Sequence, residues 1–140
     1  MIQAILGKKG TGKTKRLIDM AKEALKEEKG QIVFLDDDKR YMYDLPHQIR
    51  FVDASEYALG ENRSKSWFYG LLGGMLAVNF DITRVYVDAF FRLINNKDYS
   101  ELESIFEQME SLAKEHNVTF VLSVSGDPAE LPAFITRYAV

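Results

Sequence analysis

The sequence has 140 residues, 46% of them hydrophobic and 28% charged, which is the size and composition of one globular domain with its own core. It has no cysteine and only two histidines, which excludes a disulfide framework, a cysteine nucleophile and a thiolate or histidine-rich metal site. The formal net charge is −3, whereas nucleic-acid-binding domains usually carry a basic surplus, so we expect no nucleic-acid partner.

The basic residues concentrate in the first thirty positions, around a glycine-rich segment. No apolar run approaches the ~20 residues that cross a bilayer, and the N-terminus lacks the pattern of a secretory signal. We therefore expect a single cytoplasmic domain over residues 1–140, without membrane insertion.

The chain alternates between predicted strands and helices. Short apolar runs predict strands at residues 2–6, 32–35, 49–52, 85–87 and 119–124. Apolar residues at helical spacing predict helices from Thr14 to Leu25, from an N-cap at Ser64, and from a capping box at Ser100 and Glu103. The tail from Leu131 to Val140 predicts a helical turn and an edge strand.

Three glycines interrupt the helix that follows Ser64, namely Gly70, Gly73 and Gly74. Each weakens a helix by roughly 1 kcal/mol relative to alanine. Their absent side chains suggest close packing of this helix on a sheet.

Short strands without polar alternation, bracketed by amphipathic helices, predict an α/β three-layer sandwich. We expect a mostly parallel, five-to-six-stranded sheet with helices on both faces. Such sheets bind ligands at the carboxyl ends of their strands. Five residues are predicted to gather at that edge: Gly7, Asp36, Asp53, Asp88 and Ser125.

The clearest motif matches G-x-x-x-x-G-K-T between the first strand and the first helix. Its residues are Gly7, Lys8, Lys9, Gly10, Thr11, Gly12, Lys13 and Thr14. Glycines let the backbone curl so that several N–H groups face one anion, and the following helix points its positive end at the same place. In such a loop the lysine reaches the β- and γ-phosphates of a nucleotide and the threonine hydroxyl can bind Mg²⁺.

This loop resembles that of the P-loop NTPases, and the strand–helix pattern extends the resemblance over the whole chain. The resemblance implies that Asp88, after Val85-Tyr86-Val87, is the Walker B aspartate that holds Mg²⁺. Lys8 lies where the deviant Walker A ATPases carry a signature lysine, although an extra lysine here is more often a solvated charge. The chain also looks like small stand-alone bacterial P-loop ATPases that are sometimes labelled twitching motility proteins, but it lacks the motor's acidic and histidine boxes.

The position after Asp88 departs from many ATPases of this superfamily, because Ala89 replaces the glutamate that activates water. In recombinase-like ATPases a residue at the end of a neighbouring strand supplies the base, so Asp36 and Asp53 are the candidates here. The alternative for each is a hydrated loop carboxylate without a catalytic role. Hydrolysis is then expected to be slow or dependent on a partner. ATP is the default nucleotide by elimination, because no guanine-recognition motif stands in the right register.

Other polar and aromatic residues have two interpretations each. Ser123 and Ser125 either sense the γ-phosphate or simply end a strand. Arg92 is either a phosphate sensor or a solvated side chain. Tyr41 and Tyr43 either stack on an adenine or cap the core.

Three functions follow from these residues. The first is binding of ATP with Mg²⁺ and modest ATPase activity, alone, in a homo-oligomer or with a protein partner. The second is a small-molecule kinase, because Asp36-Asp37-Asp38 resembles the D-x-D of shikimate-type kinases; the absence of arginine from residues 93–136 argues against the closing lid that such kinases need. The third is a non-catalytic module that nucleotide stabilises.

Overall fold

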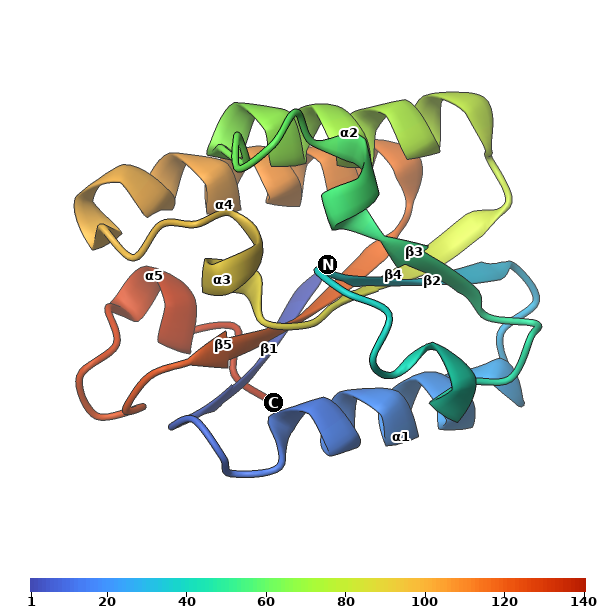
Figure 1. The fold of residues 1–140 in the computed structure, drawn as a ribbon, viewed down its shortest axis with the longest axis horizontal. Helices are drawn as coiled ribbons and strands as arrows, with labels where there is room; N and C mark the ends of the chain where they lie inside the picture. Colours follow the sequence, from blue (N-terminus) through green and yellow to red (C-terminus); the bar gives the residue numbers. More distant parts are fainter.

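The computed structural model describes residues 1–140 and shows one sheet between two layers of helices (Figure 1). The elements are β1 (Ile2–Gly7), α1 (Lys13–Leu25), β2 (Gln31–Asp36), η1 (Met42–Asp44), β3 (Arg50–Asp53), η2 (Ala54–Tyr57), α2 (Lys65–Val78), β4 (Ile82–Val87), α3 (Phe90–Leu93), α4 (Tyr99–His116), β5 (Thr119–Ser125) and α5 (Ala133–Thr136). The five strands lie in the order β1-β5-β4-β2-β3, and every pair is parallel. The predicted α/β sandwich is therefore confirmed.

The two faces of the sheet carry separate hydrophobic cores. Helix α1 covers one face, and its buried Leu17 and Ala21 pack with Phe34 of β2 and Ile5 of β1. Helices α2 and α4 cover the other face and contact each other, as Figure 1 shows above the sheet. Since both faces are covered, the strands need apolar side chains on both sides, which explains why their sequences do not alternate.

The chain ends against the outer edge of β1. Ala139 forms an isolated parallel bridge with Ala4. The Ala4 N–H donates to the Tyr138 carbonyl at 2.8 Å, and the Val140 N–H donates to the Ala4 carbonyl at 3.0 Å. The predicted edge strand is thus present as a single bridge, after the predicted turn at α5.

Helix α2 begins as predicted, because the Ser64 side chain accepts the Trp67 N–H at 3.1 Å. The predicted capping box at Ser100 and Glu103 is wrong. Helix α4 begins at Tyr99, and the Asp98 carboxylate caps it by accepting the N–H of Ser100 at 3.1 Å. An aspartate just ahead of the serine satisfies the first free N–H groups, so the serine is not needed as the cap.

The predicted close packing of the α2 glycines on the sheet is also wrong. A Cβ atom built on Gly70, Gly73 or Gly74 meets nothing within 4 Å, so these residues face away from the core. The short helix α3 was not predicted, and it turns the chain back over the sheet directly after β4. No helix combines the length and apolar character needed to cross a membrane.

Candidate functional site

The glycine-rich loop joins β1 to α1 and folds back on itself. Gly10 and Gly12 have φ angles of 82° and 83°, a backbone conformation that residues other than glycine rarely adopt. The Thr11 hydroxyl donates to the Lys8 carbonyl at 2.6 Å, and the Lys13 ammonium donates to the same carbonyl at 2.9 Å. The loop is therefore closed on itself by two side chains, with Lys13 lying across its mouth.

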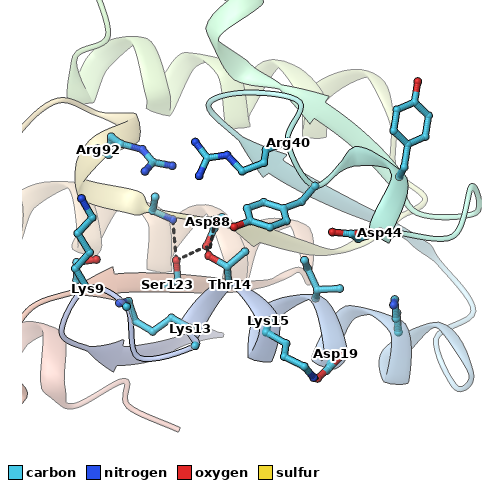
Figure 2. A pocket seen from close by; sticks show the side chains of 18 residues that line it. Lys9, Lys13, Thr14, Lys15, Asp19, Arg40, Asp44, Asp88, Arg92 and Ser123 are labelled. Atoms are coloured by element: carbon cyan, nitrogen blue, oxygen red, sulfur yellow. Dashed lines mark hydrogen bonds and ion pairs between the residues drawn. The ribbon is translucent and has the colours of Figure 1, made fainter.

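A threonine, an aspartate and a serine from three different parts of the chain meet beside this loop (Figure 2). The Thr14 hydroxyl, in the first turn of α1, lies 3.1 and 3.0 Å from the two carboxylate oxygens of Asp88. The buried Ser123 hydroxyl of β5 donates to Asp88 Oδ1 at 2.7 Å. These contacts hold the Asp88 carboxylate in place, with both of its oxygens close to the Thr14 hydroxyl.

The sheet order explains why these residues meet. Strand β5 lies between β1, which leads into the loop, and β4, which ends just before Asp88. Gly7 and Ser125 are paired across β1 and β5, so Ser125 stands next to the loop. Since all strands run the same way, their carboxyl ends share one edge, as predicted.

Ala89 stands immediately after Asp88 in a left-handed conformation with φ 51°. Its N–H donates to the Ser123 hydroxyl at 2.7 Å, so this serine is tied to both Asp88 and the turn that follows it. Strained backbone of this kind costs of the order of 1–3 kcal/mol and concentrates at functional sites.

Asp36 ends β2 next to Asp88. It is 1% exposed, and its Oδ2 atom is buried without a hydrogen-bond partner. Burial, and then the nearby Asp88 carboxylate, raise the pKa of Asp36 to about 8. A buried carboxyl with a free oxygen is suited to hold or release a proton near neutral pH.

Asp37 and Asp38 follow Asp36, and each is paired with an arginine. Arg92 of α3 binds Asp37 through two hydrogen bonds of 2.7 and 2.9 Å. Arg40 lies 3.2 Å from Asp38 Oδ2. Burial acts to raise the pKa of Asp37, but the hydrogen bonds and charge of Arg92, a hydrogen bond with Asp36 and the charge of Arg63 together hold the pKa below its usual value.

Asp53 is not brought to this site. It ends β3, the edge strand beyond β2, and its carboxylate accepts the N–H of Ser55 at 3.0 Å and the Ser55 hydroxyl at 2.6 Å. Its role in the structure is to cap η2.

A cavity of about 970 Å³ opens above the loop and runs along α1. Figure 2 shows Lys9 and Lys13 on one side of it and Arg40 and Arg92 on the other. Two loop glycines and further polar and aromatic residues complete this part of the lining: Gly10, Gly12, Thr14, Lys15, Asp19, Lys22, Tyr41, Tyr43, Asp44, Asp88, Ser123 and Ser125. The end of the cavity next to the glycine-rich loop is thus cationic, and the far end is aromatic and mixed in charge.

Lys8 points elsewhere. It does not line the cavity, and its ammonium lies 3.8 Å from Asp127. Arg40 and Asp44 line the cavity without a motif in the sequence. The only signal for them is their position in the segment between β2 and β3, which starts at the edge where a parallel sheet binds ligands.

Hydroxyl and carboxylate oxygens are the ligands that Mg²⁺ prefers. Thr14 and Asp88 place such oxygens 3.0 Å apart, close enough for both to reach one ion. The residues present therefore fit a magnesium ion next to the loop.

No protein-family model and no curated protein sequence matches the chain. Among solved structures, it is similar to a KaiC-like protein from the hyperthermophilic archaeon Pyrococcus horikoshii, with a TM-score of 0.68 and 15% identity. The match covers 98% of this chain and 68% of the archaeal chain. At that identity the likeness shows the fold alone, a parallel sheet with helices on both faces, and it gives no support to a twitching-motility label.

Proposed function

We propose that the protein binds ATP with Mg²⁺ and hydrolyses it slowly or when a partner is bound. The observation that carries this proposal is the convergence of Thr14 and Asp88 next to the glycine-rich loop, with 3.0 and 3.1 Å between the hydroxyl and the carboxylate. The P-loop fold supports nucleotide binding in general, and the site residues make the proposal specific.

The triphosphate would lie over the loop, where the N–H groups of residues 7–14 and the N-terminal end of α1 favour an anion. Lys13 has to leave the Lys8 carbonyl to reach the phosphates. That contact is on the exposed side of the loop, so breaking it costs little. Partial burial already lowers the pKa of Lys13, an effect that Asp88 offsets in part.

Thr14 and Asp88 would hold Mg²⁺, which neutralises charge on the β- and γ-phosphates when it is bound. Ser123 keeps Asp88 in place, and Ser125 stands beside the loop, paired with Gly7, where it could contact a phosphate. Tyr41 and Tyr43 line the far end of the cavity and can stack on the base.

Asp36 is the better candidate for the base. It lies next to Asp88 with a free buried oxygen, whereas Asp53 caps η2 on the edge of the sheet. Asp36 must be ionised to accept a proton from water, yet its pKa is raised to about 8. This mismatch at neutral pH, together with Ala89 in place of a glutamate, supports the slow basal rate that we propose.

The kinase alternative gains no support from the carboxylates after β2. An acceptor hydroxyl would need Asp37 or Asp38, and both are paired with arginines.

The second alternative, a non-catalytic module that nucleotide stabilises, differs from our proposal only in that it does not turn over ATP. The single-domain organisation, the cytoplasmic location and the absence of a nucleic-acid partner stay predictions.

Release of phosphate from Mg-ATP by the purified protein tests the proposal. We expect slow release that Lys13→Ala abolishes and that Lys26→Ala, an exposed lysine at the end of the same helix paired with Glu23, leaves unchanged. ATP should also raise the unfolding temperature of the wild type and not that of Lys13→Ala. A thermal shift without phosphate release would leave a binding module, and the absence of both effects would overturn the proposal.

A further inference from the structure

A second cavity, of about 440 Å³, adjoins the cavity above the glycine-rich loop. The two cavities share four lining residues: Lys9, Ala89, Arg92 and Ser125. The second cavity extends from them along α3 and the turn that leads to α4, where it has four lining residues of its own: Phe91, Asn95, Asn96 and Lys97. The proposed function gives these four residues no role.

The lining of the second cavity carries positive charge and no carboxylate. No carboxylate or carbonyl of the chain binds the ammonium group of Lys9 or Lys97. Arg92 binds Asp37 through Nε and Nη2, which leaves its Nη1 group free. Figure 2 shows the Lys9 side chain extending from the loop toward α3, the helix that carries Arg92. In a chain with a net charge of −3, cations without partners around one hollow favour an anionic ligand there.

The turn after α3 is held by Asn96. The Asn96 N–H donates to the Phe91 carbonyl at 3.1 Å, and the Asn96 side-chain oxygen accepts the Asp98 N–H at 2.7 Å. The side chains on either side of it, Asn95 and Lys97, take no part in these bonds and are exposed. The turn is therefore fixed, while the two flanking side chains remain available to a ligand.

Asn95 adopts a left-handed backbone conformation with φ 51°. Glycine adopts this conformation without strain, whereas asparagine does so at some cost and brings an amide to the cavity. The side-chain amide has both donors and an acceptor, and it has no partner within the chain. It can therefore bind a hydroxyl or carboxylate oxygen of a ligand whose charge the lysines balance.

The size and polarity of the cavity restrict the kind of ligand. Only Ala89 and Phe91 in its lining are apolar, so a hydrophobic molecule does not fit its chemistry. Its volume lies within the range of about 300–1,000 Å³ that is typical of small-molecule sites. A single inorganic anion would fill little of it.

We propose that the second cavity binds a small organic anion with at least two negative charges, a phosphate ester or a polycarboxylate. Lys9 and Lys97 balance its charge, and Arg92 Nη1 and the Asn95 amide orient it through hydrogen bonds. Its position beside the terminal phosphate of ATP rests on the proposed function, whereas the binding itself does not.

The shared residues couple the two ligands. Lys9, Arg92 and Ser125 line both cavities, so an anion in one cavity meets the charge of an anion in the other. Each ligand therefore weakens the binding of the other, and by the same factor. The organic anion would thus be an inhibitory regulator of ATP binding.

A titration of the nucleotide-free protein, followed by the backbone amide signals in nuclear magnetic resonance, tests the binding. The probes are 3-phosphoglycerate, which has a phosphate ester and a carboxylate, and citrate, which has carboxylates only; glycerol is the neutral control. At constant ionic strength we expect saturable shifts at residues 95–97, with a dissociation constant of about 1 mM or below for at least one probe. The stronger probe identifies the preferred anionic group.

Four variants separate this site from the loop and from general electrostatics. Lys97→Glu should weaken binding at least about tenfold. Lys29→Glu makes the same charge change just before β2, at the opposite edge of the sheet, and should have no effect. Asn95→Gly relieves the left-handed strain, so the protein should be no less stable, yet binding should weaken about two- to tenfold. Lys13→Ala alters the loop and should leave binding unchanged.

Bound nucleotide tests the position of the site. Saturating Mg-ATP should raise the dissociation constant of the probe at least about fivefold. An unchanged constant in the presence of bound ATP would overturn the placement beside the terminal phosphate. If ATP does not bind, the proposed function fails, while the nucleotide-free titration still decides whether the cavity is a site.

Three results of the nucleotide-free titration would overturn the proposal. The first is the absence of shifts at residues 95–97 with either probe up to about 10 mM. The second is a response confined to residues 10–14 that Lys13→Ala abolishes, because the anion then lies in the loop. The third is binding of a single-stranded oligonucleotide at residues 95–97 without a response to either probe, which would assign the cavity to nucleic acid.

Discussion

The Ser123 hydroxyl donates to Asp88 Oδ1 at 2.7 Å while it accepts the Ala89 N–H, also at 2.7 Å. One buried hydroxyl thus holds both the carboxylate proposed to bind magnesium and the strained turn after it. Thr14 is the other protein group that donates to this carboxylate. Ser123 is therefore a positioning residue rather than a sensor that faces the phosphate.

The first prediction concerns this hydroxyl. Ser123→Ala removes a buried donor and leaves the Ala89 N–H without a partner, which should cost about 1–3 kcal/mol in the free energy of unfolding. The Mg²⁺ concentration needed for half-maximal ATP-dependent stabilisation should rise. Denaturant unfolding and a magnesium titration measure the two effects. Ser125→Ala, at the half-buried end of the same strand, should change the stability little; equal losses in both variants would contradict the assignment.

The second prediction separates the two candidate bases. Asp36→Asn should abolish phosphate release from Mg-ATP while ATP still raises the unfolding temperature, because the amide cannot accept a proton from water. Asp53→Asn should keep the wild-type rate, since Asp53 caps η2 at the end of the edge strand β3, and β2 separates that strand from β4 and Asp88. If the rate falls with Asp53→Asn and not with Asp36→Asn, the base has been assigned to the wrong strand.

The third prediction is a pH dependence of stability in magnesium-free buffer. The pKa of Asp36 is raised from 3.8 to about 8, so between these values the folded protein holds a proton that the unfolded chain has lost. Its contribution to stability is complete at low pH and is lost as pH rises toward about 8. Asp36→Asn stays neutral at every pH and should therefore show a smaller fall in stability over this range. Urea unfolding at several pH values gives the comparison, and parallel curves for the two proteins would refute the raised pKa.

The fourth prediction concerns the far end of the cavity. Tyr43 is 90% exposed there and free to turn over a base. Loss of base stacking costs about 1–3 kcal/mol, so Tyr43→Ala should weaken ATP binding about 5- to 150-fold. Binding of tripolyphosphate, which has no base, should be unchanged in calorimetry. Equal weakening for both ligands would show that the tyrosine acts on the phosphates or on the fold.

The strands and the glycine-rich loop could be predicted from the sequence because their signals are local. The loop motif lies within a few consecutive residues, including Gly10, Gly12, Lys13 and Thr14. A short apolar run marks each of the five strands. The start of α4 differs from the predicted one because Asp98 and Ser100 are both residues that cap helices well, and only the path of the chain decides between them.

The arrangement of the site could not be read in the same way. Asp36, Asp88 and Ser123 come together because β2, β4 and β5 are neighbours in the sheet, and strand order is a long-range property. The exclusion of Asp53 follows from the same order, since β3 takes the edge. The pairing of Arg92 with Asp37 depends on α3, a turn too short to leave a periodic signal.

The bridge between Ala139 and Ala4 has a consequence for how the protein is made. Both neighbours of β1 come from far along the chain: Ile2 pairs with Phe120 on one side, and Ala4 with Ala139 on the other. During synthesis β1 leaves the ribosome more than a hundred residues before Phe120 and Ala139, so it has neither neighbour until those residues have been made. Because non-local pairing slows folding, β1 should be among the last strands to become stable. A nascent chain would then be unable to hold the glycine-rich loop in place until β5 has been made.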